Sequence, residues 1–305
     1  MQVAVKIENI RKTYGDIVAL KDISLRINEG EIFGIIGPDG SGKTSLFRIL
    51  ATLLLADSGT VSLLGLDVVK DYKALRKMLG YMPGRFSLYQ DLTVEENINL
   101  FASLFGTTVA AQYDIIKDIY SQIEPFKDRR AGKLSGGMKQ KLALSCALVH
   151  KPRILLLDEP TTGVDPISRK EFWGMLKRLK AWNITIVVST PYMDEAMQCD
   201  RVALIQDGNI MSVDTPDNIV NEFPARLYAV KTSNKHTILT DLRDFEYTGS
   251  AFAFGDHIHF TDVRTEFTND ELKAYLEEKG HTDIDISETT ATIEDCFIEL
   301  MRKKI

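Results

Sequence analysis

The sequence predicts an α/β fold whose core is a mostly parallel β-sheet. Two largely apolar runs, Ile154–Leu157 and Ile184–Val188, are typical of central strands that are covered on both faces. A third run, Ile32–Ile36, leads into a glycine-rich loop and then into a helical pattern at Leu46–Leu50. Strands and helices alternate from about residue 3 to residue 220, which is the order expected of a parallel sheet.

The loop after the third run carries a complete phosphate-binding motif, because residues 37–44 match G-x-x-x-x-G-K-[ST] at every required position. In such a loop backbone N–H groups surround the phosphates, Lys43 places a positive charge near the β and γ oxygens, and Thr44 can ligate Mg²⁺. The helix that follows adds its positive dipole end. The motif therefore predicts binding of a nucleoside triphosphate. The candidate binding residues are Gly37, Pro38, Asp39, Gly40, Ser41, Gly42, Lys43, Thr44 and Ser45.

An all-helical stretch is expected between about residues 85 and 150. Thr93 and Glu96 have the spacing of a capping box and mark the start of its first helix. Apolar residues follow along one face of that helix: Val94, Ile98, Phe101 and Phe105. A second helix is expected to open at Ser135.

The character of the sequence changes near residue 223, where Pro224 ends the preceding helix. Short strand candidates follow at 226–232, 257–261 and 282–286, with helices at 268–279, before Gly280, and at 292–302. We therefore expect two domains, residues 1–222 and residues 223–305. The second is predicted to be a small α+β appendage without a catalytic motif.

Composition and charge restrict the function. The 305-residue chain has a formal net charge of -6 and a pI near 5.5, which argues against broad nucleic-acid binding. It has no apolar run long enough to span a bilayer, so a role at a membrane would need another polypeptide. Cys146, Cys199 and Cys296 are far apart and are expected to be reduced thiols. His257 and His259 share a strand face without an obvious third ligand, and we expect them to be surface residues without a role.

Two further motifs extend the predicted nucleotide site. Asp158 and Glu159 end one of the apolar runs; Asp158 is expected to hold Mg²⁺ through water and Glu159 to polarise the attacking water. A helix that begins Ser135-Gly136-Gly137 presents a second bare N-terminus able to bind phosphate. The position of this segment between the phosphate loop and the carboxyl pair makes the combination specific.

In this order the motifs resemble those of the ATP-binding subunits of ABC transporters, over roughly residues 3–220. The resemblance implies a P-loop NTPase core with the helical subdomain at about 85–150. It also implies that two such domains dimerise head to tail, with each ATP between the phosphate loop of one and Ser135–Gly137 of the other. Tyr14 stands where the family stacks an aromatic ring on adenine, and Gly163–Pro166 where a loop connects the two sites.

Two positions depart from the family pattern. After Tyr81-Met82-Pro83 the family places a glutamine that contacts Mg²⁺ and the attacking water, but this chain has Gly84. After the second central strand it places a histidine that contacts the γ-phosphate, but this chain has Pro191, which offers neither a side-chain donor nor an N–H. We therefore expect slow hydrolysis at the site built on this phosphate loop.

The resemblance implies an ATPase that uses ATP and Mg²⁺ to power export through a separate transmembrane permease, at the cytoplasmic face of the cell membrane. A second ATP-binding domain would complete a homodimer or a heterodimer, and no nucleic-acid partner is expected. Two alternatives stay open: a soluble ATPase of this fold acting on ribosomes or DNA, and a regulatory ATP-binding partner with little hydrolysis. Phe86, Leu88 and Tyr89 either pack the helical subdomain or form a groove for a permease helix.

Overall fold

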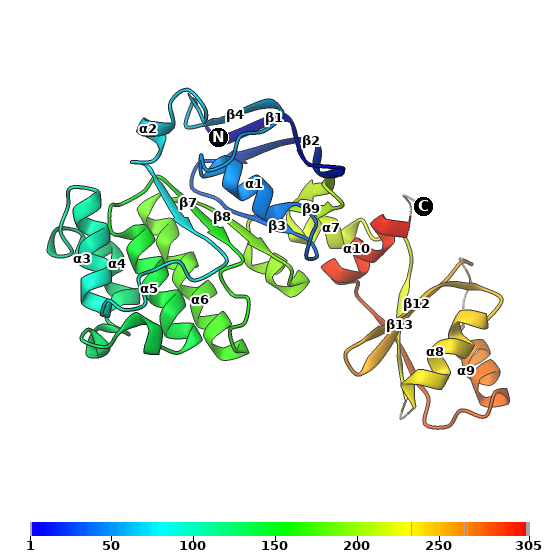
Figure 1. Cartoon of the computed structure of the whole chain (residues 1–305). Helices are drawn as coiled ribbons and strands as arrows, with labels where there is room; N and C mark the ends of the chain where they lie inside the picture. The colour runs from blue at the N-terminus through cyan, green and yellow to red at the C-terminus, as the bar shows by residue number, and fades with distance from the viewer. Residues whose placement is uncertain (1, 233, 265, 267, 303–305) are drawn as a thin grey trace. The chain divides into compact units, whose positions relative to one another are not determined.

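The computed structural model describes residues 2–232, 234–264, 266 and 268–302. The chain divides into two compact units, Met1–Pro216 and Asp217–Ile305 (Figure 1). Helix α7 (Pro216–Asn221) begins at this division, and its residues after Pro216 belong to the second unit. There the Cys296 thiol donates to the Ile219 carbonyl at 3.3 Å, which ties α7 to the last helix.

The first unit is built on a six-stranded sheet in the order β10-β9-β3-β8-β7-β6. Its strands are β3 (Ile32–Ile36), β6 (Leu79–Met82), β7 (Ile154–Asp158), β8 (Thr185–Thr190), β9 (Arg201–Gln206) and β10 (Asn209–Asp214). All neighbours pair in parallel except β9 and β10. The predicted, mostly parallel sheet is confirmed.

A second sheet, which is antiparallel, was not predicted. It has the order β2-β1-β4-β5 and consists of β1 (Val3–Tyr14), β2 (Ile17–Asn28), β4 (Ser58–Leu63) and β5 (Leu66–Asp67). Buried Ile23, Leu25 and Ile27 alternate with more exposed residues along β2. This alternation, typical of a sheet with one face toward solvent, is the signal that distinguishes it from the continuous apolar runs of the parallel sheet.

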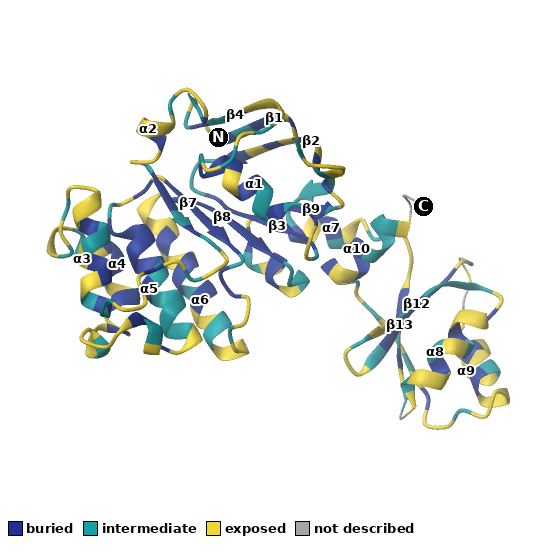
Figure 2. Cartoon of the chain, in the orientation of Figure 1, coloured by how far each residue is buried: buried dark blue, intermediate teal, exposed yellow. Residues whose placement is uncertain are grey.

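Helix α1 (Lys43–Leu50) is buried against both sheets. Leu46 and Phe47 share one apolar cluster with Ile7 of β1 and Leu156 of β7. Figure 2 shows β3, β7 and β8 largely in the colour of buried residues. The start of α1 is therefore fixed from two sides, and the phosphate loop directly precedes it.

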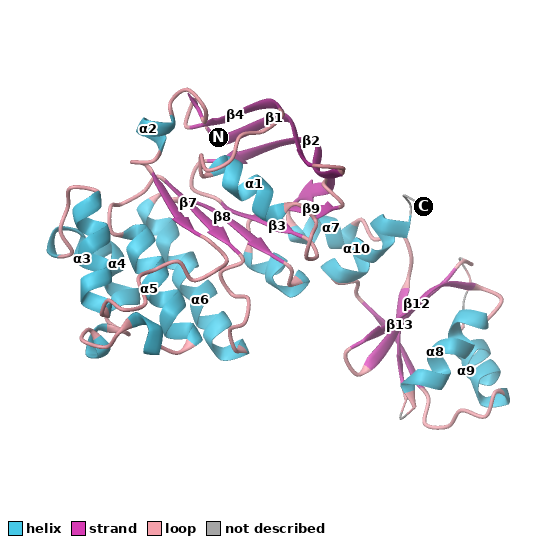
Figure 3. Cartoon of the chain, viewed as in Figure 1, coloured by secondary structure: helices cyan, strands magenta, loops and turns pink. Residues whose placement is uncertain are grey.

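The predicted helical stretch is present and is capped as expected (Figure 3). Its helices are α3 (Val94–Leu104), α4 (Tyr113–Tyr120) and α5 (Gly136–Leu148); α2 (Tyr72–Leu75) precedes them and α6 (Pro166–Leu179) follows. The Glu96 N–H donates to Thr93 Oγ1 at 3.1 Å and the Thr93 N–H donates to Glu96 Oε2 at 2.8 Å, which completes the capping box.

The second unit is a four-stranded antiparallel sheet in the order β12-β13-β11-β14. Its elements are β11 (Leu227–Lys231), α8 (Lys235–Asp244), β12 (Thr248–Phe254), β13 (His257–Asp262), α9 (Asn269–Glu278), β14 (Asp285–Thr289) and α10 (Ile293–Arg302). Its apolar core joins one face of the sheet to α8 and α9. Sequence reasoning missed β12 and α8 and placed β14 three residues early, because small residues in β12 and a weak apolar stripe in α8 hide the pattern.

His259 is not the surface residue expected from the sequence. It is 7% exposed, its Nδ1 lies 2.7 Å from Asp295 Oδ1, and its ring stacks on Phe254 at 4.3 Å. Both the Thr292 N–H and its hydroxyl donate to the other oxygen of Asp295 at 2.8 and 2.7 Å. Burial alone would raise the pKa of Asp295, but the hydrogen bonds from His259 and Thr292 lower it below its ordinary value. The contact fixes the start of α10 on the sheet.

Asp295→Asn should weaken this contact at neutral pH. A hydrogen bond to a buried charge is worth about 2 kcal/mol, so amide hydrogen exchange in β13 and α10 should accelerate by roughly tenfold or more. Because the carboxyl pKa is lowered on folding, its stabilisation is complete above the ordinary aspartate pKa of about 3.9 and is lost as the pH falls through the lower folded value. The exposed Asp256→Asn is the matched control; equal exchange in all three proteins would contradict the assignment.

Candidate functional site

The phosphate loop runs from the end of β3 into α1, and its glycines are required by close backbone contacts. A Cβ at Gly37 would lie 2.1 Å from the Ile205 carbonyl oxygen, and one at Gly42, where φ is +104°, would lie 2.4 Å from that of Ala19. Ser41 is 2% exposed, and its hydroxyl has no hydrogen-bond partner among the described residues. A buried polar atom without a partner inside a glycine-rich loop fits a site that receives phosphate oxygens.

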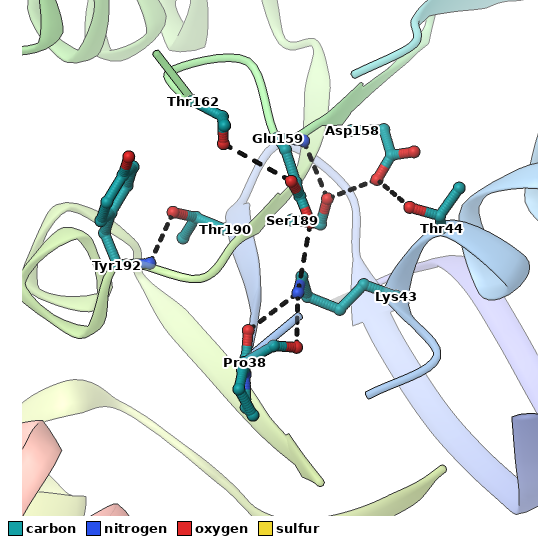
Figure 4. Close-up of polar contacts among 10 residues, drawn as sticks. Pro38, Lys43, Thr44, Asp158, Glu159, Thr162, Ser189, Thr190 and Tyr192 are labelled. Atoms are coloured by element: carbon teal, nitrogen blue, oxygen red, sulfur yellow. Dashed lines mark hydrogen bonds and ion pairs between the residues drawn. The ribbon is translucent and has the colours of Figure 1, made fainter. Parts of the chain in front are cut away.

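Lys43 points across this loop toward the carboxyl pair, as Figure 4 shows. Its ammonium group donates to the Gly37 and Pro38 carbonyls at 2.8 and 2.9 Å and lies 3.3 Å from Glu159 Oε1. The lysine side chain is only 2% exposed, so its charge acts in a poorly screened environment. The arrangement places one cation between the phosphate loop and a carboxylate.

Asp158 lies at the centre of a small polar cluster. Its Oδ1 accepts from the Ser189 hydroxyl at 2.7 Å and from the Thr44 hydroxyl at 3.3 Å. Burial raises the pKa of Asp158 above its ordinary value, and the charge of Glu159 adds to this, while the hydrogen bonds and Lys43 oppose it. Oxygen donors from a hydroxyl and a carboxylate are the ligands that suit Mg²⁺, so Thr44 and Asp158 fit the predicted metal site.

Glu159 has an unusual backbone, with φ at +50°. Its N–H donates to the Ser189 hydroxyl at 2.9 Å and lies 3.1 Å from the Ser189 carbonyl, which holds this conformation in place. A non-glycine residue in the left-handed region costs free energy and persists only where its surroundings fix it. Here the turn aims the carboxylate at Lys43. Sequence reasoning missed Ser189, which no motif marks.

Tyr14 lies beside the loop, 45% exposed, with its hydroxyl 3.3 Å from Ser45 Oγ. The segment before it is held by Asp57, which accepts from the Thr13 N–H and hydroxyl at 2.6 Å each and from Lys12 Nζ at 2.7 Å. These bonds, led by the one from Lys12, lower the pKa of Asp57 to about 2. Asp57 is a further residue that the sequence did not reveal, because it lies 44 residues from Thr13.

The comparisons with known proteins agree with this geometry. Residues 20–162 match the protein family described as ABC transporter. Nod factor export ATP-binding protein I of Burkholderia lata is 32% identical over 309 residues, which cover 97% of this chain and 96% of that protein. The chain belongs to the ABC transporter family of ATP-binding proteins.

Other relatives share the family and the fold. A probable multidrug ABC transporter ATP-binding protein of Escherichia coli, YbhF, is 39% identical over 290 residues; the match covers 94% of this chain and 50% of YbhF, so the chain spans about half of that relative. The structure of cbiO1 from Clostridium perfringens, part of the ABC transporter complex cbiONQ, has a TM-score of 0.65 at 27% identity over 73% of this chain and 92% of its own. The dimeric structure of the ATP-binding cassette MJ0796 bound to ADP and Pi has a TM-score of 0.63 at 28% identity. The match covers 69% of this chain and 98% of that one. These structures confirm the predicted cassette fold.

The Ser135–Gly137 segment of this ABC protein lies beside the start of α6 and, among the described residues, does not contact the phosphate loop or the carboxyl pair. Ser135 caps α5 by accepting from the Met138 N–H at 3.4 Å. The Gly163 carbonyl lies 3.8 Å from a Cβ built at Gly136, and Ser168 Oγ lies 3.0 Å from one built at Gly137. Within the chain, the structure therefore groups this segment with the start of α6, while Lys43, Thr44, Asp158 and Glu159 form the other group.

Of the two departures from the ABC pattern, one lies beside the carboxyl pair and the other follows a residue bonded to the phosphate loop. A Cβ at Gly84 would lie 3.0 Å from the Asp158 carbonyl oxygen and 3.7 Å from Glu159 Cβ. Pro191 directly follows Thr190, whose carbonyl accepts from the Gly37 N–H at 3.2 Å. His150 does not replace the family histidine, since it stacks on Phe105 at 3.7 Å in the helical region and bonds to the Leu79 carbonyl.

An apolar groove of about 350 Å³ lies between β6, the following loop and helices α3 and α5. Its lining is Ala51, Leu53, Arg76, Leu79, Tyr81, Met82, Pro83, Phe86, Ser87, Leu88, Phe101, Phe105, Gln140, Ala143, Cys146, Ala147 and His150. Phe86 and Leu88 line this groove, Leu88 being only 8% exposed, whereas Tyr89 is 58% exposed and is not part of the lining. No helix in the described ranges is both long and apolar enough to cross a membrane.

Lys43→Ala should weaken binding of MgATP by roughly a hundredfold, since removal of one partner from a desolvated charge pair costs several kcal/mol. Isothermal titration calorimetry measures the change. Lys6→Ala is the control, because Lys6 pairs with Glu8 on the outer surface of β1. An unchanged dissociation constant in Lys43→Ala would show that the loop does not bind phosphate as described.

Proposed function

We propose that this chain is the ATP-binding and ATP-hydrolysing subunit that powers export through a separate membrane permease. The observation that supports this most is the convergence of Lys43, Thr44, Asp158 and Glu159 at one edge of the sheet in a member of the ABC family. The names of its relatives, a multidrug and a Nod factor export protein, favour export over an action on ribosomes or DNA. Residues 223–305 would act as an accessory domain.

The geometry gives each residue a role in hydrolysis. Lys43 and the backbone of residues 37–42 would bind the β- and γ-phosphates, and Tyr14 would stack on the adenine. Thr44 and Asp158 would hold Mg²⁺, which neutralises charge on the phosphate oxygens when bound. Glu159 would orient the attacking water and accept its proton.

A second ATP-binding domain would complete the site. Ser135 is the N-cap of α5 and Gly136 and Gly137 are its first residues, so this segment forms a helix N-terminus, which attracts anions. Within the chain, the segment lies beside Gly163 and Ser168. The segment would therefore bind the ATP held by a partner's phosphate loop, in a homodimer or a heterodimer. The dimeric form of MJ0796 bound to ADP and Pi supports this arrangement by similarity.

We further propose that hydrolysis at this chain's own phosphate loop is slow. Two positions that supply transition-state contacts in the family carry no suitable side chain here, Gly84 and Pro191, and both lie next to the catalytic segments. Loss of one positioned donor lowers the rate by about 10²–10³. The retained Glu159 leaves activity low but measurable.

Pro191→His combined with Gly84→Gln should accelerate steady-state ATPase activity of the purified chain by at least about tenfold. Loss of one positioned donor lowers kcat by about 10²–10³, and the two new side chains should recover part of that factor. A Cβ at position 84 needs a small shift of the Asp158 carbonyl, so each single variant is measured as well. Brisk turnover by the unmodified chain, with no gain in any variant, would contradict the slow-site proposal.

The apolar groove is the proposed docking site for a helix of the permease, which would hold the chain peripherally at the cytoplasmic face of the membrane. Mostly hydrophobic and aromatic side chains line it, as expected for a helix-in-groove contact. Leu53 lines the groove and is 57% exposed, so its surface is free to contact a partner.

Leu53→Glu should shift the chain from the membrane pellet of its source cells to the supernatant by several-fold, while the MgATP dissociation constant of the purified chain stays the same, because a charge would be buried at the contact. Leu104→Glu provides the matched control, since Leu104 is 68% exposed on α3 but does not line the groove. Equal sedimentation of the two variants would exclude the groove as the docking site.

A further inference from the structure

Glu195 is a buried carboxylate that the proposed mechanism does not use. It is 4% exposed and lies in the 3₁₀ helix Met193–Gln198, shortly after Pro191. Its Oε2 accepts from the Thr161 hydroxyl at 3.0 Å, while Oε1 has no hydrogen bond among the described residues and lies 3.9 Å from an Arg169 nitrogen. A carboxylate with incomplete hydrogen bonding costs stability when buried, so its position points to a role other than stabilising the fold.

Thr161 anchors the turn that carries Glu159. It is fully buried and lies two residues after that glutamate. The Thr162 N–H donates to the Glu159 carbonyl at 3.3 Å, and the Val164 N–H donates to the Thr161 carbonyl at 3.2 Å. One side-chain hydroxyl thus connects Glu195 to the chain between the strained residue Glu159 and the loop at Gly163.

Arg169 extends the same cluster to helix α6. Its guanidinium lies 4.5 Å from the centre of the Tyr192 ring and within 3.8 to 3.9 Å of the carboxylates of Asp194 and Glu195. The cluster therefore joins three segments: the turn after β7, the start of α6 and the chain that follows Pro191. Pro191 itself cannot donate a hydrogen bond to that turn.

We infer that Glu195 is a positioning residue for ATP hydrolysis: through Thr161 and Arg169 it holds the turn that carries Glu159, and the neighbouring loop, in the geometry required for attack on the γ-phosphate. This inference rests on the proposed function, because it assigns Glu195 to the same reaction. Glu195 acts through Thr161, whose hydroxyl connects it to the turn. Its effect should therefore fall on the chemical step and not on nucleotide affinity.

The test compares Thr161→Val with Thr161→Ser in the full chain, by single-turnover hydrolysis of radiolabelled ATP and by calorimetric titration with MgATP. Thr161→Val keeps the shape of the side chain but removes the hydroxyl, and it should lower the hydrolysis rate by about tenfold with an unchanged dissociation constant. Thr161→Ser should restore the rate. Asp118→Asn, which changes an exposed carboxylate that pairs with Arg178 outside this cluster, should leave the rate within twofold of the unmodified chain.

Glu195→Met, which removes both carboxylate oxygens but keeps much of the side-chain volume, supplies an independent check in case Thr161→Val perturbs the fold. It should also slow hydrolysis, and the double variant with Thr161→Val should lose less than the product of the two single effects, because both changes break the Glu195–Thr161 hydrogen bond. Equal rates for Thr161→Val and the unmodified chain, equal losses in the Val and Ser variants, or additive losses in the double variant would overturn the inference. Absence of ATP binding or hydrolysis in the unmodified chain would instead overturn the proposed function, and the inference with it.

Discussion

Parallel pairing of three strands brings the nucleotide site together. In the register of β3 and β8, Ile36 lies opposite Thr190, and in that of β7 and β8, Asp158 lies opposite Ser189. The carboxyl ends of the strands therefore meet at one edge, where parallel sheets typically bind ligands. Lys43, Asp158 and the segment before Pro191 become neighbours although more than 100 residues separate the first two along the chain.

A few hydrogen bonds hold the polar groups at this edge of the sheet in place. Ser189 serves both members of the carboxyl pair, through its hydroxyl to Asp158 and by accepting from the Glu159 N–H. The surrounding strands are fully buried on both faces, so water cannot replace these bonds and each lost contact would leave a polar group without a partner. The same low exposure strengthens the attraction between Lys43 and Glu159. Stability and chemistry thus depend on the same side chains.

The nucleotide site and the second unit are separated along the chain. The first unit contains the phosphate loop, the carboxyl pair, the α5 N-terminus and the apolar groove. The second unit has its own sheet and its own apolar core, and its buried His259–Asp295 pair fixes the last helix to that sheet. A unit that closes its own core can differ between relatives without disturbing the nucleotide site.

The sequence alone determined the phosphate loop, the carboxyl pair, the capping box at Thr93 and the parallel sheet, since each is written in contiguous residues or in the periodicity of burial. Tertiary structure decided the rest. The contacts of Asp57 with Thr13, of Glu195 with Thr161 and of His259 with Asp295 join residues 34 to 44 positions apart. The strand order of the antiparallel sheet and the pairing of β12 with β13 were likewise decided only by the tertiary structure. The local sequence predicts which residues of a segment are buried, but it does not predict which distant side chains they contact. Those contacts depend on strand register and on helix packing.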